Sequence, residues 1–147
     1  MFFSRLFRQS VIRGSIVDLR KRHHVYDEDS VSFDILLHDT DTVAGMCDLR
    51  FGYTWELYYA GNIGYRIHEP YRGHRYAYYA CRLLLEQAYE QYGMNELYIT
   101  CSPDNIASKK TIEKLGAVFV AEEDVPPAHW LYKRGETKKR IYKIFLP

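Results

Sequence analysis

The stretch from Gly61 to Gly93, GNIGYRIHEPYRGHRYAYYACRLLLEQAYEQYG, decides the fold of this chain. Its first part predicts a short strand, because Ile63, Tyr65 and Ile67 alternate with small or polar residues and can face a core. From Tyr76 the apolar period lengthens to that of an amphipathic helix. The expected core face of this helix consists of Tyr76, Ala77, Ala80, Leu83, Leu84, Ala88 and Tyr89.

The basic segment between strand and helix, Arg72-Gly73-His74-Arg75-Tyr76-Ala77, predicts an anion site. Backbone N–H groups at the start of a helix have no intrahelical acceptor, and the helix dipole favours negative charge there. These amides could therefore hold a phosphate. The pattern also fits an ordinary strand-turn-helix with a solvated basic turn, because short glycine motifs are weak evidence.

The same segment resembles the acyl-CoA loop of the GCN5-related N-acetyltransferase (GNAT) family, which reads Arg or Gln, two residues, Gly, one residue, then Gly or Ala. Arg72 and Ala77 match the ends of this pattern, and Arg75 stands where the family has its glycine. Arginine keeps the main-chain N–H, but it costs about 1 kcal/mol if the position requires a positive φ. The resemblance implies that the loop amides hold the CoA pyrophosphate, with cofactor contacts at Ile67, Arg72, Gly73, His74, Arg75, Tyr76 and Ala77.

A second segment, residues 96–120, reads ELYITCSPDNIASKKTIEKLGAVFV and predicts a strand, a proline turn, a short helix, a glycine stop and another strand. Ser102 or Asp104 is expected to cap the helix, and Gly116 to end it in the left-handed conformation. The Asn-x-x-Ser and Glu-Lys-Leu-Gly patterns resemble the second cofactor motif of the family, most closely that of its ribosomal-protein-acetylating (Rim-like) branch. This resemblance adds Asn105 and Ser108 to the implied CoA contacts.

Length and composition bear on the number of domains, the class of partner and the cellular location. A chain of 147 residues predicts one domain over residues 1–147. The net charge of +1 favours neither nucleic acid nor an anionic membrane as a partner, so anion recognition must be local. Three cysteines without a CxxC pair and a start without a long apolar run predict a cytoplasmic protein. The six histidines form no metal-ligand pattern, so no metal is expected.

The resemblance implies an α/β (α+β) fold, the GNAT fold, with a mixed, twisted sheet of six to seven strands flanked by helices. Further strands are expected within 15–24, 31–38, 42–51 and 140–146. Too few residues separate the first two strands for the usual N-terminal helices, which are expected to be shortened or missing. Either the segment 2–13 supplies a replacement helix, or the acceptor side is open or completed by another subunit, as in a homodimer.

Two segments are expected to be connections. The aromatic residues of 52–60 can line a pocket or pack the preceding hairpin against the core. The segment 121–139 is polar and bears prolines, and its acidic residues 122–124 can attract a cationic amine or form a solvated loop.

The implied chemistry is direct attack of an amine, on a small molecule or a peptide, on the thioester of the co-substrate acetyl-CoA. CoA is expected to enter where the strands at 62–68 and 97–101 diverge. The tyrosine acid of many relatives falls on Ile112, which cannot donate a proton, so Ser108 is the candidate near the thiolate; alternatively, it only hydrogen-bonds its own helix.

The general base is a separate question. The branch's glutamate falls on Asn62, which cannot accept a proton. His68 is the candidate base because its ordinary pKa suits proton transfer near neutrality. Glu56, Glu69 or a chain of solvent molecules are the alternatives.

These patterns predict an acetyl-CoA-dependent N-acetyltransferase whose acceptor the sequence does not specify. The alternative is a catalytically degenerate family member that binds acyl-CoA or a partner without turnover, and the departures at Arg75, Asn62 and Ile112 motivate it. A nucleic-acid binder using the basic turn would show strong salt dependence, and the near-neutral charge argues against it.

Overall fold

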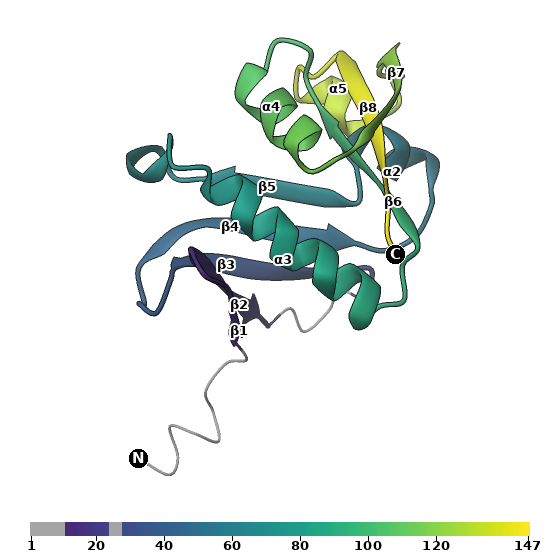
Figure 1. Cartoon of the computed structure of the whole chain (residues 1–147). Helices are drawn as coiled ribbons and strands as arrows, with labels where there is room; N and C mark the ends of the chain where they lie inside the picture. Colours follow the sequence, from purple (N-terminus) through teal and green to yellow (C-terminus); the bar gives the residue numbers. More distant parts are fainter. Residues whose placement is uncertain (1–10, 24–27) are drawn as a thin grey trace.

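The computed structural model describes residues 11–23 and 28–147, which form two antiparallel sheets (Figure 1). The first sheet has five strands in the order β1-β2-β3-β4-β5. Its strands are β1 (Val11–Arg13), β2 (Val17–Arg22), β3 (Ser30–Leu37), β4 (Val43–Arg50) and β5 (Ile63–Ile67). The second sheet has the order β6-β8-β7, made of β6 (Glu96–Cys101), β7 (Val118–Asp124) and β8 (Lys138–Phe145).

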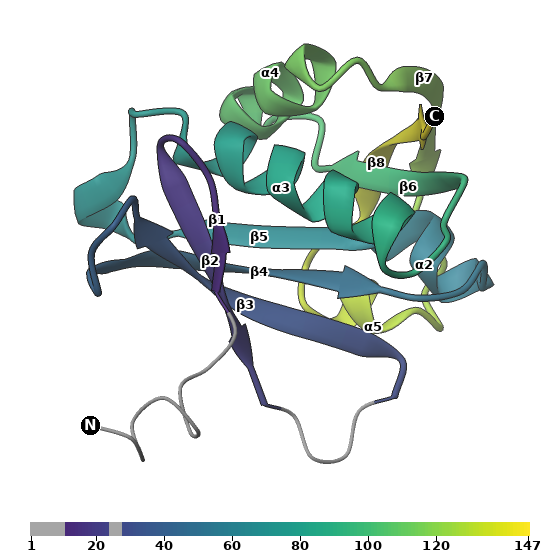
Figure 2. The ribbon, with the colours of Figure 1, turned by 60° about the horizontal axis from the view of Figure 1, so that its bottom comes forward.

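Four α-helices and one 3-10 helix connect the described strands. They are α2 (Trp55–Ala60), the 3-10 helix η1 (Glu69–Tyr71), α3 (Tyr76–Glu90), α4 (Ile106–Lys114) and α5 (Trp130–Lys133). In Figure 2, α3 and α5 lie on opposite sides of the strands β4 and β5. β5 is the edge strand of this sheet.

The core lies between the first sheet and α3 and extends to β6, β8 and α4. Ala80, Cys81, Leu84 and Ala88 are fully buried on this helix, and the small side chains allow its backbone to lie close to the sheet. The expected core face is confirmed at Ala80, Leu84 and Ala88, whereas Tyr89 is 42% exposed. Each helical residue advances about 100°, so Tyr89 lies beyond the buried stripe that ends at Ala88.

The predicted GNAT fold is confirmed, with three corrections. The described chain has eight strands in two antiparallel sheets instead of one mixed sheet of six or seven, because β5 and β6 meet only at one end before they diverge. Val11–Arg13 form a strand and not part of a replacement helix, and residues 2–10 lie outside the described part of the chain. The segments 52–60 and 121–139 are not plain connections, since they contain α2, α5 and most of β7.

A buried carboxylate fixes the corner between β2 and the β3–β4 turn. Asp18 is 1% exposed and accepts hydrogen bonds from the amides of Gly14 (3.0 Å) and Asp39 (2.8 Å) and from His38 Nδ1 (2.9 Å). Burial by itself would raise the pKa of Asp18, but the hydrogen bonds from Asp39, His38 and Gly14 outweigh it and lower the pKa.

A lowered pKa in the folded state means that ionised Asp18 stabilises the protein above the pKa of the unfolded chain, about 3.9. We expect this stabilisation to be lost as the pH falls below about 4, through the folded pKa. Asp18→Asn should lower the free energy of unfolding at pH 7 by about 2 kcal/mol, because in either orientation the new amide nitrogen would face at least one N–H donor. Urea titration at several pH values measures both effects. Asp124→Asn is the control, since that side chain is 85% exposed.

Candidate active site

The loop before α3 adopts the strained geometry of an anion-binding turn. Gly73 has φ of +90°, and Arg75, the residue that precedes α3, has φ of 61° and ψ of 23°. This left-handed conformation is the one in which a glycine is favoured, which explains the family's glycine at the position of Arg75. The chain carries the arginine there at a cost of about 1 kcal/mol.

The main-chain amides of residues 73–78 have no hydrogen-bond acceptor within the described chain. The amides on either side are satisfied, because Arg72 donates to the carbonyl of Glu69 and Tyr79 donates to the carbonyl of Arg75. A continuous row of free N–H groups at the start of a 15-residue helix has the geometry that suits an anion.

A cavity of about 870 Å³ lies beside these amides, and its described lining is entirely basic or uncharged. The cations that line it are Arg66, Arg72, Arg75, Lys110 and Lys114. Of the residues expected to contact CoA, the cavity is lined by Ile67, Arg72, Gly73, Arg75, Tyr76, Ala77, Asn105 and Ser108. His74 does not line it; its ring stacks on that of Tyr76 with centroids 5.2 Å apart.

The two sheets are joined at Asn62, whose side chain is completely buried. Its main-chain N–H donates to the carbonyl of Tyr98 (2.8 Å), and its side-chain oxygen accepts from the amide of Tyr98 (2.8 Å). Its side-chain nitrogen donates to the carbonyls of Arg50 and Gly52, both at 2.9 Å. Beyond this junction β5 is the edge strand of its sheet, so its outer main-chain groups are open to an extended ligand.

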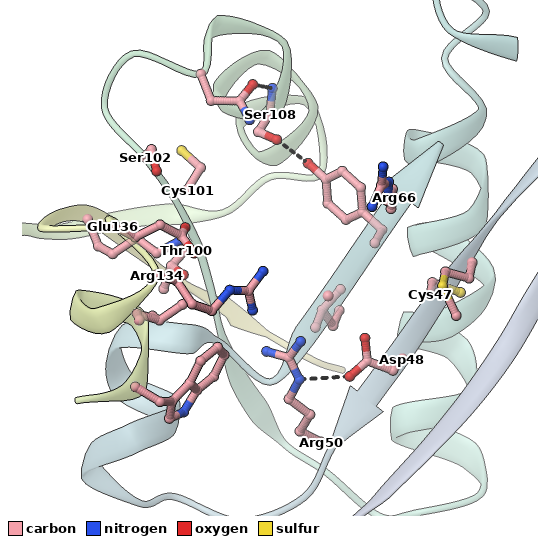
Figure 3. Close-up of a pocket in the computed structure, with 18 of the residues that line it drawn as sticks. Cys47, Asp48, Arg50, Arg66, Thr100, Cys101, Ser102, Ser108, Arg134 and Glu136 are labelled. Carbon is pink, nitrogen blue, oxygen red and sulfur yellow. Dashed lines mark hydrogen bonds and ion pairs between the residues drawn. The ribbon is translucent and has the colours of Figure 1, made fainter. Parts of the chain in front are cut away.

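Two hydroxyl groups face each other across the opening between β5 and α4. The Tyr65 hydroxyl donates to Ser108 Oγ at 3.0 Å, the contact drawn from Ser108 in Figure 3. Asn105, rather than Ser102 or Asp104, caps α4, because its side-chain oxygen accepts from the amide of Ser108 (3.1 Å). Burial raises the pKa of Tyr65 to about 12, and the hydrogen bond to Ser108 offsets only part of this effect.

A second cavity, of about 440 Å³, meets the first at this hydroxyl pair. Tyr65, Arg66, Asn105 and Ser108 line both cavities. The second cavity is further lined from β4 and β5 by Asp48, Arg50 and Gly64, from β6 by Thr100 and Cys101, and from the C-terminal part by Trp130, Arg134, Glu136 and Lys139. The two cavities therefore adjoin one another at the hydroxyl pair, and together they are called the passage below.

Sequence reasoning missed part of this site. Tyr65 was expected to face the core and does pack against it, but the alternation along β5 gave no sign that its hydroxyl meets Ser108. The cavity-lining residues of 130–139 were missed because this segment reads as a polar connection. Periodicity provides no signal for a helix as short as the four residues of α5.

The candidate base His68 lies away from the passage. It is exposed at the end of β5, precedes η1, and is absent from the lining of both cavities, as are Glu56 and Glu69. Asn62 lines neither cavity, and Ile112 is fully buried in the core. The acidic stretch 122–124 does not line the passage either. Glu122 pairs with Arg140, and Asp124 pairs with Lys138, across the β7–β8 ladder.

Two sheets that splay from a single junction, with a helix-opening loop beside the edge strand, are the architecture of a GNAT-type domain. The sequence model of the acetyltransferase (GNAT) domain family matches residues 9–118, and the chain belongs to this family. The resemblance that the two motifs indicated is thereby confirmed. Within the described residues there is no group of metal-ligating side chains and no helix long and apolar enough to cross a membrane.

Comparison with known proteins identifies further similarities. "Uncharacterized N-acetyltransferase YnaD" from Bacillus subtilis (strain 168) is 27% identical over 89 residues, 60% of this chain and 51% of that protein. The chain thus matches about half the length of this curated relative. A solved acetyltransferase from Agrobacterium tumefaciens str. C58 has a TM-score of 0.68 at 17% identity, covering 95% of this chain and 96% of that one.

The ribosomal α-N-protein acetyltransferase RimL, solved in complex with coenzyme A, is similar in fold. It superimposes with a TM-score of 0.62 at 17% identity, over 80% of this chain and 62% of that one. At such identities the likeness concerns the fold alone.

Proposed function

We propose that this protein is an acetyl-CoA-dependent N-acetyltransferase that transfers the acetyl group directly to a primary amine. The observation that carries the proposal is the row of free amides at 73–78 beside a basic cavity that adjoins a second cavity. The pyrophosphate of CoA would accept hydrogen bonds from these amides. Pantetheine would run along the open edge of β5, which brings the thioester to Tyr65 and Ser108.

The reaction needs no enzyme-bound acyl group. The amine nitrogen attacks the thioester carbon, the new C–N bond forms, the C–S bond breaks, and the sulfur leaves as a thiolate. The Tyr65–Ser108 pair has two hydroxyl hydrogens and shares only one of them between its oxygens, which leaves the other for the sulfur. The second cavity would hold the amine and is called the acceptor cavity below. Asp48 and Glu136 line it and are candidates to receive the amine's proton in place of His68.

The geometry weakens each reason for the degenerate alternative. The amide of Arg75 is still free, Asn62 is a structural residue outside both cavities, and the hydroxyl missing at Ile112 has a counterpart in Tyr65. The test below distinguishes turnover from binding of acetyl-CoA without turnover. The three described cysteines are free and buried, which supports a reducing, cytoplasmic location as part of the proposal.

The experiment is calorimetry with acetyl-CoA followed by a thiol-release assay over a panel of amines. The panel includes peptide N-termini, because the similar protein RimL is named for acetylation of a ribosomal protein. Binding together with thiol release on an amine supports the proposal. No heat at millimolar acetyl-CoA would exclude it, and binding without turnover on any amine would favour the degenerate member.

Arg75 provides a direct test of the loop. Arg75→Glu should weaken acetyl-CoA binding about 30-fold, because it places a carboxylate beside the pyrophosphate. Arg75→Gly should raise the free energy of unfolding by about 1 kcal/mol, since glycine tolerates φ of 61°. We expect Arg75→Gly to bind only a few-fold more weakly, because the amide survives. Calorimetry and urea unfolding measure the two effects; equal binding by Arg75→Glu and the wild type would contradict the assigned orientation of CoA.

A further inference from the structure

The charges of the second cavity are unbalanced. Its described lining holds four cations, Arg50, Arg66, Arg134 and Lys139, but only two carboxylates, Asp48 and Glu136. Both carboxylates are already paired: Asp48 Oδ2 lies 2.7 Å from Arg50 Nε, and Glu136 Oε1 lies 2.9 Å from Lys139 Nζ. Two positive charges are therefore left over.

The unpaired cations are Arg66 and Arg134. Neither has a carboxylate within ion-pair distance in the described chain. The guanidinium of Arg134 lies 5.5 Å from the centre of the Trp130 ring, a contact that orients the side chain. In Figure 3 the guanidinium groups of Arg134 and Arg50 are directed toward one another across the cavity.

Asp48 balances the charge of Arg50, so the surplus positive charge of the cavity belongs to Arg66 and Arg134. A bound anion would offset this surplus charge, and guanidinium geometry suits the oxygens of a carboxylate or phosphate. The side chain of Arg50 is held in place without a ligand, because its Nη1 also donates to the carbonyls of Ala60 (3.1 Å) and Gly61 (3.3 Å). Its guanidinium group is thus preorganised for an anion between it and Arg134.

We propose that the acceptor is an amine whose molecule also carries an anionic group, a carboxylate or a phosphate, bound between Arg50 and Arg134. This inference rests on the proposed acetyl transfer. The anion would hold the acceptor at the far side of the cavity and leave its amine free to reach the thioester at Tyr65 and Ser108. Polyamines and other polycations would be poor acceptors, because no unpaired carboxylate lines the described cavity.

Matched acceptor pairs that differ only in the anion test the inference. Glycine and glycinamide form the carboxylate arm, O-phosphoethanolamine and ethanolamine the phosphate arm, and spermidine serves as the polycation. We expect kcat/KM for the anionic member of at least one pair to exceed that of its neutral partner by about 10-fold or more, the worth of a charge-assisted hydrogen bond. The better arm identifies the anion.

Substitutions test whether Arg134 is the residue that contacts the anionic group of the acceptor. Arg134→Gln should raise KM for the preferred anionic acceptor about 10-fold and leave the neutral partner unchanged. Lys133→Gln is the matched control, because this neighbour on α5 lines neither cavity. Equal use of both members of each pair, a preference for spermidine, or insensitivity to Arg134→Gln would overturn the inference while leaving acetyl transfer intact.

A binding measurement covers the case without turnover. Calorimetry of O-phosphoethanolamine and of glycine with the CoA-saturated protein should give a heat with one of them that Arg134→Gln reduces about 10-fold in affinity. No heat with either ligand would overturn the inference. Failure of acetyl-CoA itself to bind is a different result, because it removes the proposed function. In that case the same titrations are made on the protein alone.

Discussion

Asn62→Asp is expected to lower the free energy of unfolding at pH 7.5 by about 3 kcal/mol. The substitution keeps the shape of the side chain but removes both donors to the carbonyls of Arg50 and Gly52. A carboxylate oxygen would then face these two carbonyl oxygens in a site without solvent exposure. Only the acceptor for the amide of Tyr98 would survive.

The pH dependence follows from the same contacts. Burial against carbonyl oxygens would raise the folded pKa of the new aspartate above its unfolded value. The penalty should therefore be smallest below about pH 4, where the group is protonated in both states, and should grow as the pH rises. Urea titrations at pH 4 and pH 7.5 measure the difference.

Asn95→Asp is the control for this experiment, because Asn95 is exposed and its side chain makes no hydrogen bond in the described structure. We expect it to change stability by less than about 0.5 kcal/mol. A similarly small effect of Asn62→Asp would mean that the junction between the sheets does not depend on this side chain. The divergence of the two sheets beside the proposed CoA site would then have to depend on other contacts.

The sequence predicted those features of the site that arise from local chemistry. Alternation predicted β5, and the basic turn predicted an anion site where the free amides lie. The resemblance of the Asn-x-x-Ser pattern to the family's second motif implied CoA contacts at Asn105 and Ser108, which line the first cavity. The glycine stop at Gly116 is confirmed by its φ of +83°. Each of these depends on residues within a few positions of one another.

The features that the sequence could not predict depend on distant residues. Asn62 was considered only as a failed base, because its role requires carbonyls from the end of β4 and the segment after it, and an amide from β6, to converge on it. The helix α2 was missed because its aromatic side chains suggested a connection, although Thr54 caps it by accepting from the amide of Leu57. The acceptor cavity joins β4 to residues 130–139, which no local pattern relates.

Tyr65→Phe is expected to lower kcat by roughly 10- to 100-fold with little change in KM for acetyl-CoA. In the proposed complex with acetyl-CoA the Tyr65–Ser108 pair lies beside the developing thiolate, so loss of the Tyr65 hydroxyl should affect the transition state more than the bound substrate. Its pKa of about 12 exceeds that of a thiol, about 8.5, so Tyr65 would keep its proton and donate it in the hydrogen bond to Ser108, whose own hydrogen then faces the sulfur. Steady-state thiol release measures both constants.

The pKa of Tyr65 also predicts how the effect of Tyr65→Phe depends on pH. A tyrosine with a pKa of about 12 stays protonated through the working range, so the ratio of wild-type to Tyr65→Phe rates should be constant from about pH 6.5 to 9.5. A ratio that falls as the pH rises would show that the hydroxyl ionises within this range and acts as a proton donor. Tyr79→Phe, in a partly buried tyrosine of α3 outside the passage, controls for the loss of a hydroxyl as such.

Ser108→Ala distinguishes a relay from two independent donors. If the hydroxyls act as one unit, Ser108→Ala should cost about as much as Tyr65→Phe, and the double variant should lose no more than the worse single variant. Losses that multiply would mean that each hydroxyl contacts the sulfur separately. Full activity in both single variants would instead mean that the thiolate leaves unaided, as its low pKa permits, and that the pair only closes the wall between β5 and α4.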